Sequence, residues 1–224
     1  MPAELPPGSE KLIYDVEWRL IHAGTAVVDV GPSSIKMKLE SAGLVTALFK
    51  IDDLYTVNFQ DTYCVTSSLL DAMEGKHHRE TKITYDRVQR RAFFVERDLL
   101  TESIVRKTDV ETPNCVHDPL VAMKRIREMK VEPGQTVQVP VSDGRRSAEV
   151  KAEALGRENI KTAAGSFKTI KYEAGLLNGV VYTRKGRLFV WLSDDARRLP
   201  VRIQLRMSFP LGTVTLDLQK QERL

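Results

Sequence analysis

The chain has 224 residues, 42% of them apolar and 29% charged, and a formal net charge of +4. These values are typical of a globular protein. No apolar run approaches the roughly 18 residues that a membrane-spanning helix needs, which argues against that class. The 34 basic residues are interleaved with 30 acidic ones, which favours a solvated surface over a nucleic-acid-binding groove.

Short alternating segments predict a succession of β-strands along most of the chain. In the first, residues 11–20, the positions of Leu12, Tyr14 and Val16 fit a strand with one buried face. A tight turn or bulge is expected at residues 22–24. Further strands are predicted at residues 25–30, 34–41, 49–52, 54–60, 63–73, 79–85, 88–97, 101–110, 136–141, 147–155, 159–162, 167–177 and 180–183, with a helical turn or strand bend at 44–48. About a dozen short strands joined by short turns indicate an antiparallel sandwich or barrel.

A single amphipathic helix is predicted at about residues 118–130. Asp118 is a favourable N-cap, and Pro119 occupies the first helical position, where its missing N–H costs nothing. Leu120, Met123 and Ile126 then recur at helical spacing. One such helix in a β-rich chain is expected to cover or plug one face of the sheet.

The strand predicted at residues 188–192 is apolar on both faces. The residues that point to one face and those that point to the other are all apolar, and Phe189 and Trp191 share one of the two faces. A strand of this kind has to be covered on both sides, either by other parts of the protein or by a ligand. Another strand, with Val201 and Ile203 on one face, follows after a polar corner.

The corner between these two strands carries the sequence Ser-Asp-Asp-Ala at residues 193–196. Asp194 and Asp195 are more typical of turn formers than of a catalytic carboxylate pair. Four arginines follow and form a small basic patch, which is either a solvated face or a site for an acidic headgroup or phosphate: Arg197, Arg198, Arg202 and Arg206.

Two cysteines leave two interpretations open. Cys64 and Cys115 are either buried free thiols or the ends of one disulfide, 51 residues apart. Such a bridge would contribute about 4 kcal/mol by loop-entropy arithmetic and would indicate an oxidising compartment. A nucleophilic pair of Cys115 and His117 is a weaker interpretation, because no orienting residue can be identified. His77 and His78 are neighbours beside a turn, and solvent exposure is expected for them.

The sequence contains no phosphate-binding loop, dinucleotide fingerprint, nucleophile elbow or zinc-protease motif. We therefore expect no cofactor and no metal. Residues 1–8 are expected to be a flexible segment, residues 9–218 a single β-rich domain, and the charged tail at 219–224 to fray. The start lacks the basic and apolar regions of a signal peptide, which taken literally predicts a cytoplasmic protein. The prolines leading into the first strand are nevertheless typical of a junction that follows a removed leader.

Four segments together resemble a known family: GSEKLIYDVEWRLIHAGTAVVDV, CVHDPLVAMKRIRE, AAGSFKTIKYE and GRLFVWLSDDARRLPVRI. The family is the bacterial domain-of-unknown-function family 3108, and the similarity spans about residues 9–218. The most specific part is residues 190–195 with Arg198 and Pro200. The resemblance implies an exported cell-envelope protein. It also implies a curved antiparallel sheet forming an open or partly closed barrel, similar to the lipoprotein carriers, in which helices cover a hydrophobic hollow. It brings no catalytic residues.

These observations lead to a functional expectation with two alternatives. We expect a non-enzymatic periplasmic protein, peripheral to the membrane at most, that binds a lipid-like ligand or an envelope protein and no nucleic acid. The candidate ligand-binding residues are Phe189, Trp191, Arg198 and Arg202. The first alternative is a structural or interaction protein with a packed core and no small ligand. The second is a hydrolase or thiol enzyme built on the Cys-His pair or the aspartates of the corner.

Overall fold

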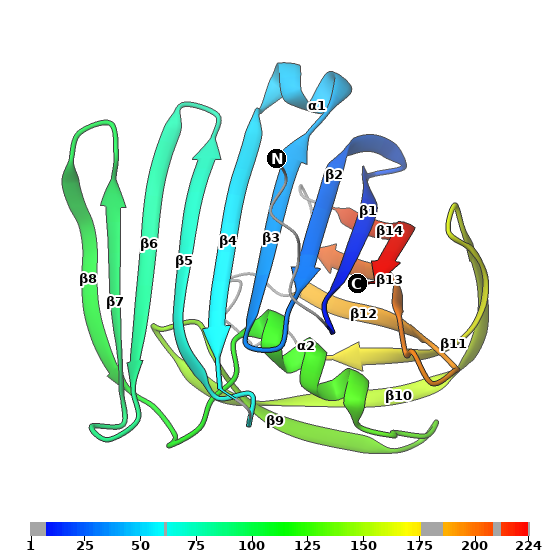
Figure 1. The fold of residues 1–224 in the computed structure, drawn as a ribbon. Helices are drawn as coiled ribbons and strands as arrows, with labels where there is room; N and C mark the ends of the chain where they lie inside the picture. Colours follow the sequence, from blue (N-terminus) through cyan, green and yellow to red (C-terminus); the bar gives the residue numbers. More distant parts are fainter. Residues whose placement is uncertain (1–7, 61, 176–185, 208–211, 224) are drawn as a thin grey trace.

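The computed structural model describes residues 8–60, 62–175, 186–207 and 212–223. Within these ranges the chain forms one antiparallel sheet of 14 strands and two helices (Figure 1). The elements are β1 (Glu10–Trp18), β2 (Ile21–Val30), β3 (Ser34–Ser41), α1 (Gly43–Leu48), β4 (Ile51–Phe59), β5 (Val65–Glu74), β6 (His77–Asp86), β7 (Arg91–Asp98), β8 (Ser103–Glu111), α2 (Pro119–Glu128), β9 (Thr136–Ser142), β10 (Ser147–Thr162), β11 (Gly165–Ala174), β12 (Gly186–Ser193), β13 (Pro200–Met207) and β14 (Thr213–Arg223).

The sheet consists of two meanders joined along one seam. Strands β1 to β8 are neighbours in chain order, and so are β9 to β14. The seam is the pairing of β1 with β14, which leaves β8 and β9 as the two edges of the described sheet. The sheet curves around α2, which lies on its concave face (Figure 1). This is the predicted open barrel with one main covering helix, and that prediction is confirmed.

The N-terminal hairpin turns earlier than the sequence predicts. The turn lies at Arg19 and Leu20, which both have positive φ angles of 51° and 67°, and β2 already begins at Ile21. Residues 22–24, predicted to form a tight turn or a bulge, form a bulge within β2, because Glu17 pairs with His22 and Val16 pairs with Gly24. Gly24 closes this bulge. A Cβ atom there would approach the carbonyl oxygen of Glu40 to 2.1 Å, so this glycine permits the close approach of β3.

Three further segments differ from the prediction. The segments at residues 49–52 and 54–60, predicted as separate strands, are the single strand β4. The last strand, β14, continues through Arg223 instead of fraying at residue 219, because its backbone pairs with β1 as far as Glu10. The Gln221 side chain also donates to Glu10 Oε2 at 2.9 Å. The strands predicted at 147–155 and 159–162 are one strand, β10, with an irregularity after Ala154. The flexible segment, apart from its last residue, and the strand at 180–183 lie outside the described residues.

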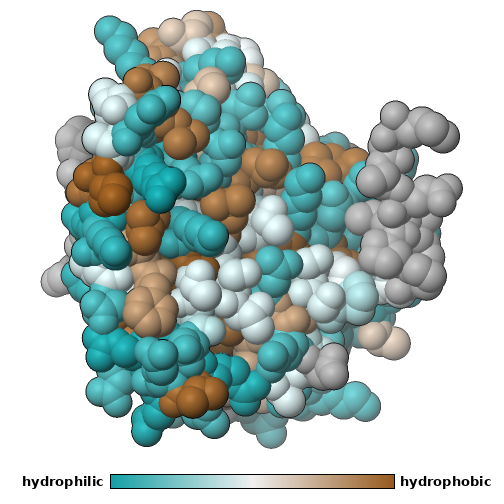
Figure 2. All heavy atoms as spheres, turned by 60° about the vertical axis from the view of Figure 1, so that its left-hand side comes forward, coloured by the Kyte–Doolittle hydropathy of each residue, from teal (hydrophilic) through white to brown (hydrophobic). Residues whose placement is uncertain are grey.

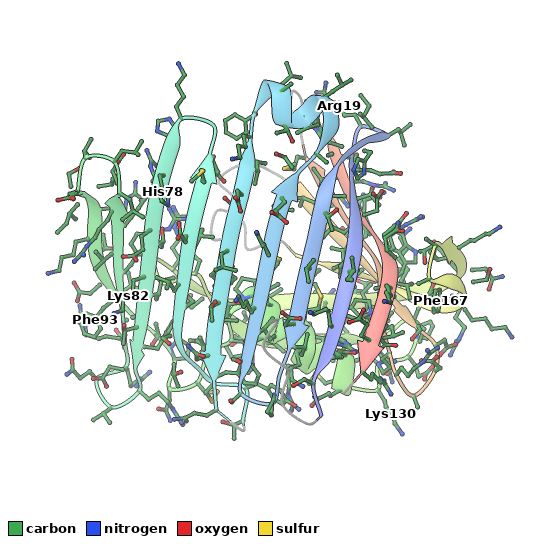
Figure 3. The ribbon with its side chains drawn as sticks, turned by 45° about the horizontal axis from the view of Figure 1, so that its top comes forward. Arg19, His78, Lys82, Phe93, Lys130 and Phe167 are labelled. Atoms are coloured by element: carbon green, nitrogen blue, oxygen red, sulfur yellow. A yellow bond between two sulfur atoms is a disulfide. The ribbon has the colours of Figure 1, made fainter. Side chains whose placement is uncertain are left out.

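Strand β12 is buried on both faces, as its sequence predicts. On the concave face, Val190 and Leu192 pack in a cluster with Tyr172. On the outer face, Phe189 and Trp191 join a different cluster. This second cluster also contains Ile160 and Phe167 from the far end of the β10–β11 hairpin, where Figure 3 shows Phe167 at the periphery of the sheet. No helix of the described chain is long and apolar enough to cross a bilayer.

Candidate functional site

The first turn of α2 is fixed by a buried carboxylate. Asp118 accepts a hydrogen bond from the backbone N–H of Leu120 at 2.9 Å, as an N-cap should, and Pro119 follows at the first helical position. The phenol of Tyr55 on β4 donates to the same carboxylate. Burial raises the pKa of Asp118 to about 6, although these hydrogen bonds oppose the shift. The helix is thereby attached to the concave face of the first meander.

The segment leading into α2 joins the two meanders. Cys64 and Cys115 form a disulfide with a Cα–Cα distance of 5.0 Å, so the disulfide interpretation is correct and the free-thiol one is wrong. The backbone N–H of Val65 donates to Val116 O at 2.9 Å, on the side of β5. On the other side, His117 forms a parallel bridge with Val141 of β9. These contacts hold the start of α2 between the two halves of the sheet.

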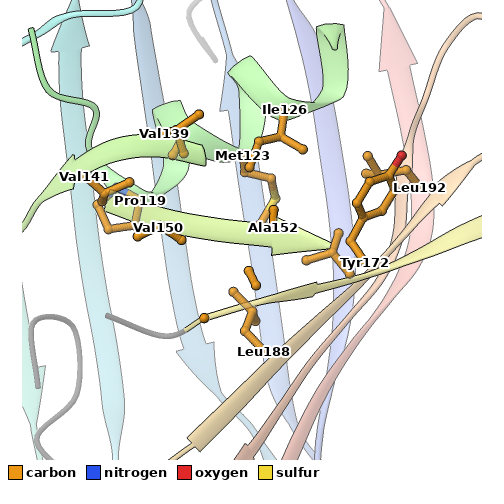
Figure 4. A pocket seen from close by; sticks show the side chains of 14 residues that line it. Pro119, Met123, Ile126, Val139, Val141, Val150, Ala152, Tyr172, Leu188 and Leu192 are labelled. Atoms are coloured by element: carbon orange, nitrogen blue, oxygen red, sulfur yellow. The ribbon is translucent and has the colours of Figure 1, made fainter. Parts of the chain in front are cut away.

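An apolar cavity of about 130 Å³ lies between α2 and the second meander (Figure 4). Fourteen residues line it: Pro119, Ala122, Met123, Ile126, Val139, Val141, Val150, Ala152, Tyr172, Ala174, Gly175, Leu188, Val190 and Leu192. Of these, Tyr172 alone has a polar side-chain group. Its hydroxyl donates to Val131 O at 2.8 Å and accepts from Arg198 Nη2 at 2.6 Å, so it presents no free hydrogen-bonding group to the cavity.

Small side chains explain why this space stays open. Ala152 and Ala174 project from neighbouring strands, and Ala122 lies opposite them on the helix. Larger side chains at these positions would fill the volume between sheet and helix. The cavity therefore follows from the sequence itself and requires no displacement of the helix.

A second hollow of about 490 Å³ occupies the concave face of β3 to β7, on the other side of the first turn of α2. Its lining is mixed. The strands contribute most of the apolar residues, and the charged groups are those of Asp53, Glu96, Asp118, Asp143 and Arg145. Burial raises the pKa of Asp53 to about 7, and the negative charge of Glu74 adds to this effect. Pro119 borders both this groove and the apolar cavity, so the two hollows adjoin there.

Phe189 and Trp191, two of the predicted ligand-binding residues, lie on the outer face of β12, opposite the cavity. The Trp191 indole donates to Glu158 Oε2 at 2.7 Å. The ring of Phe189 is covered by cations, with Lys171 Nζ 5.2 Å and Arg206 Cζ 4.8 Å from its centroid. Both aromatic side chains are buried by the protein's own residues.

The two predicted arginines lie in different places. Arg202 forms a two-bond ion pair with Asp217 at 2.5 and 2.6 Å, beside Trp191 on the outer face. Arg198 instead contacts Tyr172 and the end of α2 on the concave side. The four predicted residues therefore do not meet at one site, and their role in ligand binding stays a prediction.

The residues considered for catalysis have structural partners in the fold. Cys115 is bonded to Cys64, which leaves no thiolate for a Cys-His pair. His117 is hydrogen-bonded through Nδ1 to the carbonyl of Tyr63 at 2.7 Å, and burial lowers its pKa. The described residues contain no group of three or more metal-ligating side chains.

Both aspartates of the predicted corner act in the turn after β12. Asp195 accepts hydrogen bonds from the hydroxyl of Ser193 at 2.7 Å and from the backbone N–H of Arg197 at 3.0 Å. Burial opposes ionisation of Asp195, but these bonds hold its pKa below the usual value. Asp194 pairs with Arg157 at 2.8 Å. The prediction that both residues lie in a turn is confirmed, and the side chain of Asp195 is the one that stabilises the turn.

Two lining residues were not predicted from the sequence: Tyr172 of the apolar cavity and Asp53 of the groove on the first meander. The signal for Tyr172 was its position in an alternating strand that pairs with β12, directly beside Val190. For Asp53 the signal was a carboxylate at an inward position of an otherwise apolar alternation, between Ile51 and Tyr55. An ionisable group at such a position is a sign of function or of a specific partner.

Comparison with one solved structure shows a shared fold. A β-barrel-like protein of the domain of unknown function DUF1849 from Brucella abortus aligns with a TM-score of 0.62 and 9% identity, covering 99% of this chain and 100% of that one. A DUF1089 family protein from Pseudomonas aeruginosa aligns with a TM-score of 0.45 and 11% identity over 82% and 90% of the chains. A protein described as exported, with a YmcC-like fold, from Bacteroides fragilis gives 0.36 and 11% over 98% and 97%.

Sequence comparison identifies the family. No curated protein matches the chain. Residues 13–219 match the family described as Protein of unknown function (DUF3108), which is nearly the whole length. The resemblance inferred from the four sequence segments is thereby confirmed, and the chain belongs to the DUF3108 family.

Proposed function

We propose that this protein is a non-enzymatic protein of the cell envelope that binds an apolar, lipid-like molecule between α2 and the concave face of the sheet. The observation that carries the proposal is the apolar cavity next to Pro119, Met123 and Ile126. Filling such a space with hydrocarbon stabilises the complex by about 25 cal/mol for each Å² of apolar surface removed from water. An apolar cavity without free polar groups does not bind water well.

The proposed location rests on the disulfide and on the family resemblance. Disulfides persist in oxidising compartments such as the bacterial periplasm and are rare in the cytosol. The bond between Cys64 and Cys115 closes a separation of 51 residues and secures the start of α2. A protein whose ligand-covering helix depends on such a bond is suited to the envelope.

Native mass spectrometry tests the proposal. The protein is produced with an added export signal and measured first under native and then under denaturing conditions. We expect an adduct of lipid-like mass that disappears on denaturation. In the variant Ala152→Phe, whose new side chain fills the cavity, the adduct should be lost. Ala148→Phe is the matched control, because Ala148 is exposed on the same strand and does not line the cavity.

The outcomes separate the proposal from a folding defect. Thermal unfolding shows whether Ala152→Phe remains folded, and the smaller Ala152→Leu replaces it if it does not. An adduct that persists in the folded, filled variant would overturn the cavity as the binding site. A clean apo mass from several bacterial hosts would overturn the ligand proposal.

The alternative is a protein that binds another protein and no small ligand. The observation in its favour is β8, an edge of the described sheet that is exposed along most of its length, including Ile104 and Val105. Figure 2 shows the side of the molecule that carries this edge, with apolar side chains set among polar ones. An open edge strand can pair with a strand of a partner. A clean apo mass would favour this alternative.

A further inference from the structure

The groove on the first meander ends in a cluster of charged side chains. Asp53 on β4 and Glu96 on β7 line the groove. The register aligns Asp53 with Ala72 and Ala72 with Arg79, which places Arg79 on the same concave face. Arg79 Nη1 lies 3.1 Å from Glu96 Oε1. This end of the groove is therefore charged, whereas most of the remaining lining is apolar apart from the ion pair of Arg145 with Asp143 and the buried Asp118.

Several polar atoms of this face are buried without a hydrogen-bond partner in the described chain. They are Asp53 Oδ1, Arg79 Nε and Ser68 Oγ. Ser68 is only 2% exposed and lines the groove nearer to α2, where it lies close enough to the Tyr55 phenol to influence its pKa. Buried polar groups without partners each cost about 1–3 kcal/mol, so they are expected to find partners in the functional state.

The balance of charge at the polar end is negative. Asp53 and Glu96 face the groove, and Glu74 follows on the same face because it pairs with Ile51, two residues before Asp53. Arg79 is already paired with Glu96. The Asp53 carboxylate is thus an acceptor in a negative environment, and a positively charged donor is its best complement.

The remainder of the groove suits a hydrocarbon chain. Its apolar lining comes from four strands and the start of α2: Met37, Leu39, Leu70, Ile83, Phe94 and Leu120. This lining leads from the charged end to Pro119, where the apolar cavity begins. A molecule with one polar end and one long apolar end matches this order of surfaces.

We propose that the ligand is an amphiphile with a protonated amine at its polar end, which Asp53 binds, and with an apolar chain that follows the groove toward Pro119. This inference rests on the proposed function, since it names the class of ligand and extends its binding site from the apolar cavity at Pro119 into the groove. The ammonium donates to the buried Asp53 Oδ1, and the apolar chain replaces water along the groove.

Binding of such a ligand depends on pH in a defined direction. The groups that bear on Asp53 are Glu74 and Asp71 on β5, Asp52 beside it on β4, and the backbone N–H of Met73. The carboxylates raise the pKa of Asp53 to about 7 in addition to burial, and the N–H opposes them. Arg79 on β6 and Glu96 on β7 face it across the groove. An alkylammonium keeps its proton between pH 6 and pH 8, so its affinity should rise as Asp53 ionises.

Isothermal titration with probes of equal chain length tests the inference. The probes are decylammonium, decanoate and 1-decanol, titrated into the oxidised full chain after delipidation. At pH 8 we expect decylammonium to bind about tenfold or more tightly than the other two, the factor that one hydrogen bond to a charged group supplies. At pH 6 this preference should shrink.

Two variants complete the test. Asp53→Asn keeps the shape of the side chain, and it should abolish the preference for decylammonium and its pH dependence while 1-decanol still binds. Asp52→Asn removes the same charge from the neighbouring residue, which points to the outer face, and it should retain the preference. Equal binding of the three probes, or a preference that survives Asp53→Asn, overturns the amine inference alone. Binding of none of them overturns the proposed function as well.

Discussion

Arg127 and Arg198 exchange hydrogen bonds between their side chains and backbones. Arg127 Nε donates to Arg198 O at 3.0 Å, and Arg198 Nε donates to Arg127 O at 2.7 Å. Arg127 lies in the last turn of α2, and Arg198 lies in the corner between β12 and β13. The pair therefore attaches the end of the helix to the second meander, just as Asp118 attaches its beginning to the first. Helix α2, which covers the cavity, is therefore attached to the sheet at both of its ends.

Replacing Arg198 should loosen this attachment. Arg198→Ala removes the hydrogen bond to Arg127 O and the one to the Tyr172 hydroxyl, and we expect it to lower the free energy of unfolding by about 1.5–3 kcal/mol. Arg197→Ala is the control, because Arg197 pairs with Asp195 at the surface and such pairs contribute about 0–1 kcal/mol. Urea denaturation followed by circular dichroism measures both. Equal losses in the two variants would contradict the role of the pair.

Removing the disulfide should destabilise the protein through its unfolded state. The double variant Cys64→Ser/Cys115→Ser frees a loop of 51 residues, for which loop-closure entropy predicts a loss of about 4 kcal/mol. Guanidinium titration of the oxidised protein, the reduced protein and the double variant measures this. The reduced protein and the variant should agree. An oxidised protein with the same midpoint as the other two would show that the bond does not form or does not stabilise the fold.

The carboxylate of Asp118 has two separable functions. Asp118→Ala removes the N-cap, worth about 1 kcal/mol, and leaves the buried Tyr55 phenol without its acceptor, worth about 1–3 kcal/mol. Asp118→Asn keeps a capping oxygen and should lose less. Thermal and urea unfolding of both variants provide the comparison. The expectation fails if the asparagine variant is as unstable as the alanine variant.

The raised pKa of Asp118 also determines how the stability of the protein depends on pH. The pKa of Asp118 rises from 3.8 to about 6 on folding, so the folded state binds the proton more tightly. Its contribution is complete below pH 3.8 and is lost as the pH rises through 6, which amounts to about 3 kcal/mol. The free energy of unfolding of the wild type, minus that of Asp118→Asn, should fall over this range. A difference that is constant between pH 4 and pH 7 would contradict the raised pKa.

The sequence predicted the architecture well because the relevant signals are local. Alternation located most of the strands, and Asp118 followed by Pro119 located the start of the helix to the residue. The two-sided burial of β12 followed directly from the lack of polar residues at 188–192. Each of these features depends on neighbours within one element, which a single sequence displays.

The site was harder to predict because it depends on register between distant strands. Phe189 and Trp191 were obvious as large apolar residues, but only the pairing of β12 with β11 and β13 decides which set faces α2. This pairing places Val190 and Leu192 on the face toward α2. Asp53 lies 65 residues before Asp118, and nothing local indicates that both border one groove. Position in an element could be predicted, but the shared hollow could not.

Gly24 offers a direct test of the corrected N-terminal hairpin. If residues 22–24 formed an open turn, Gly24→Ala would be tolerated. In the structure, a Cβ atom at this position would lie 2.1 Å from Glu40 O, so β2 and β3 would have to separate and lose hydrogen bonds. We expect Gly24→Ala to lower the free energy of unfolding by more than about 2 kcal/mol.

Gly156→Ala is the matched control for this substitution. Gly156 also lies within a long strand, β10, but a Cβ atom there would have no neighbour within 4 Å. Alanine at this position should be neutral or should stabilise the protein by up to about 1 kcal/mol, because it restricts the unfolded chain. Urea denaturation of the two variants side by side measures the contrast. If both lose the same stability, the effect is the general cost of replacing a strand glycine, and the close approach of β2 and β3 is not its cause.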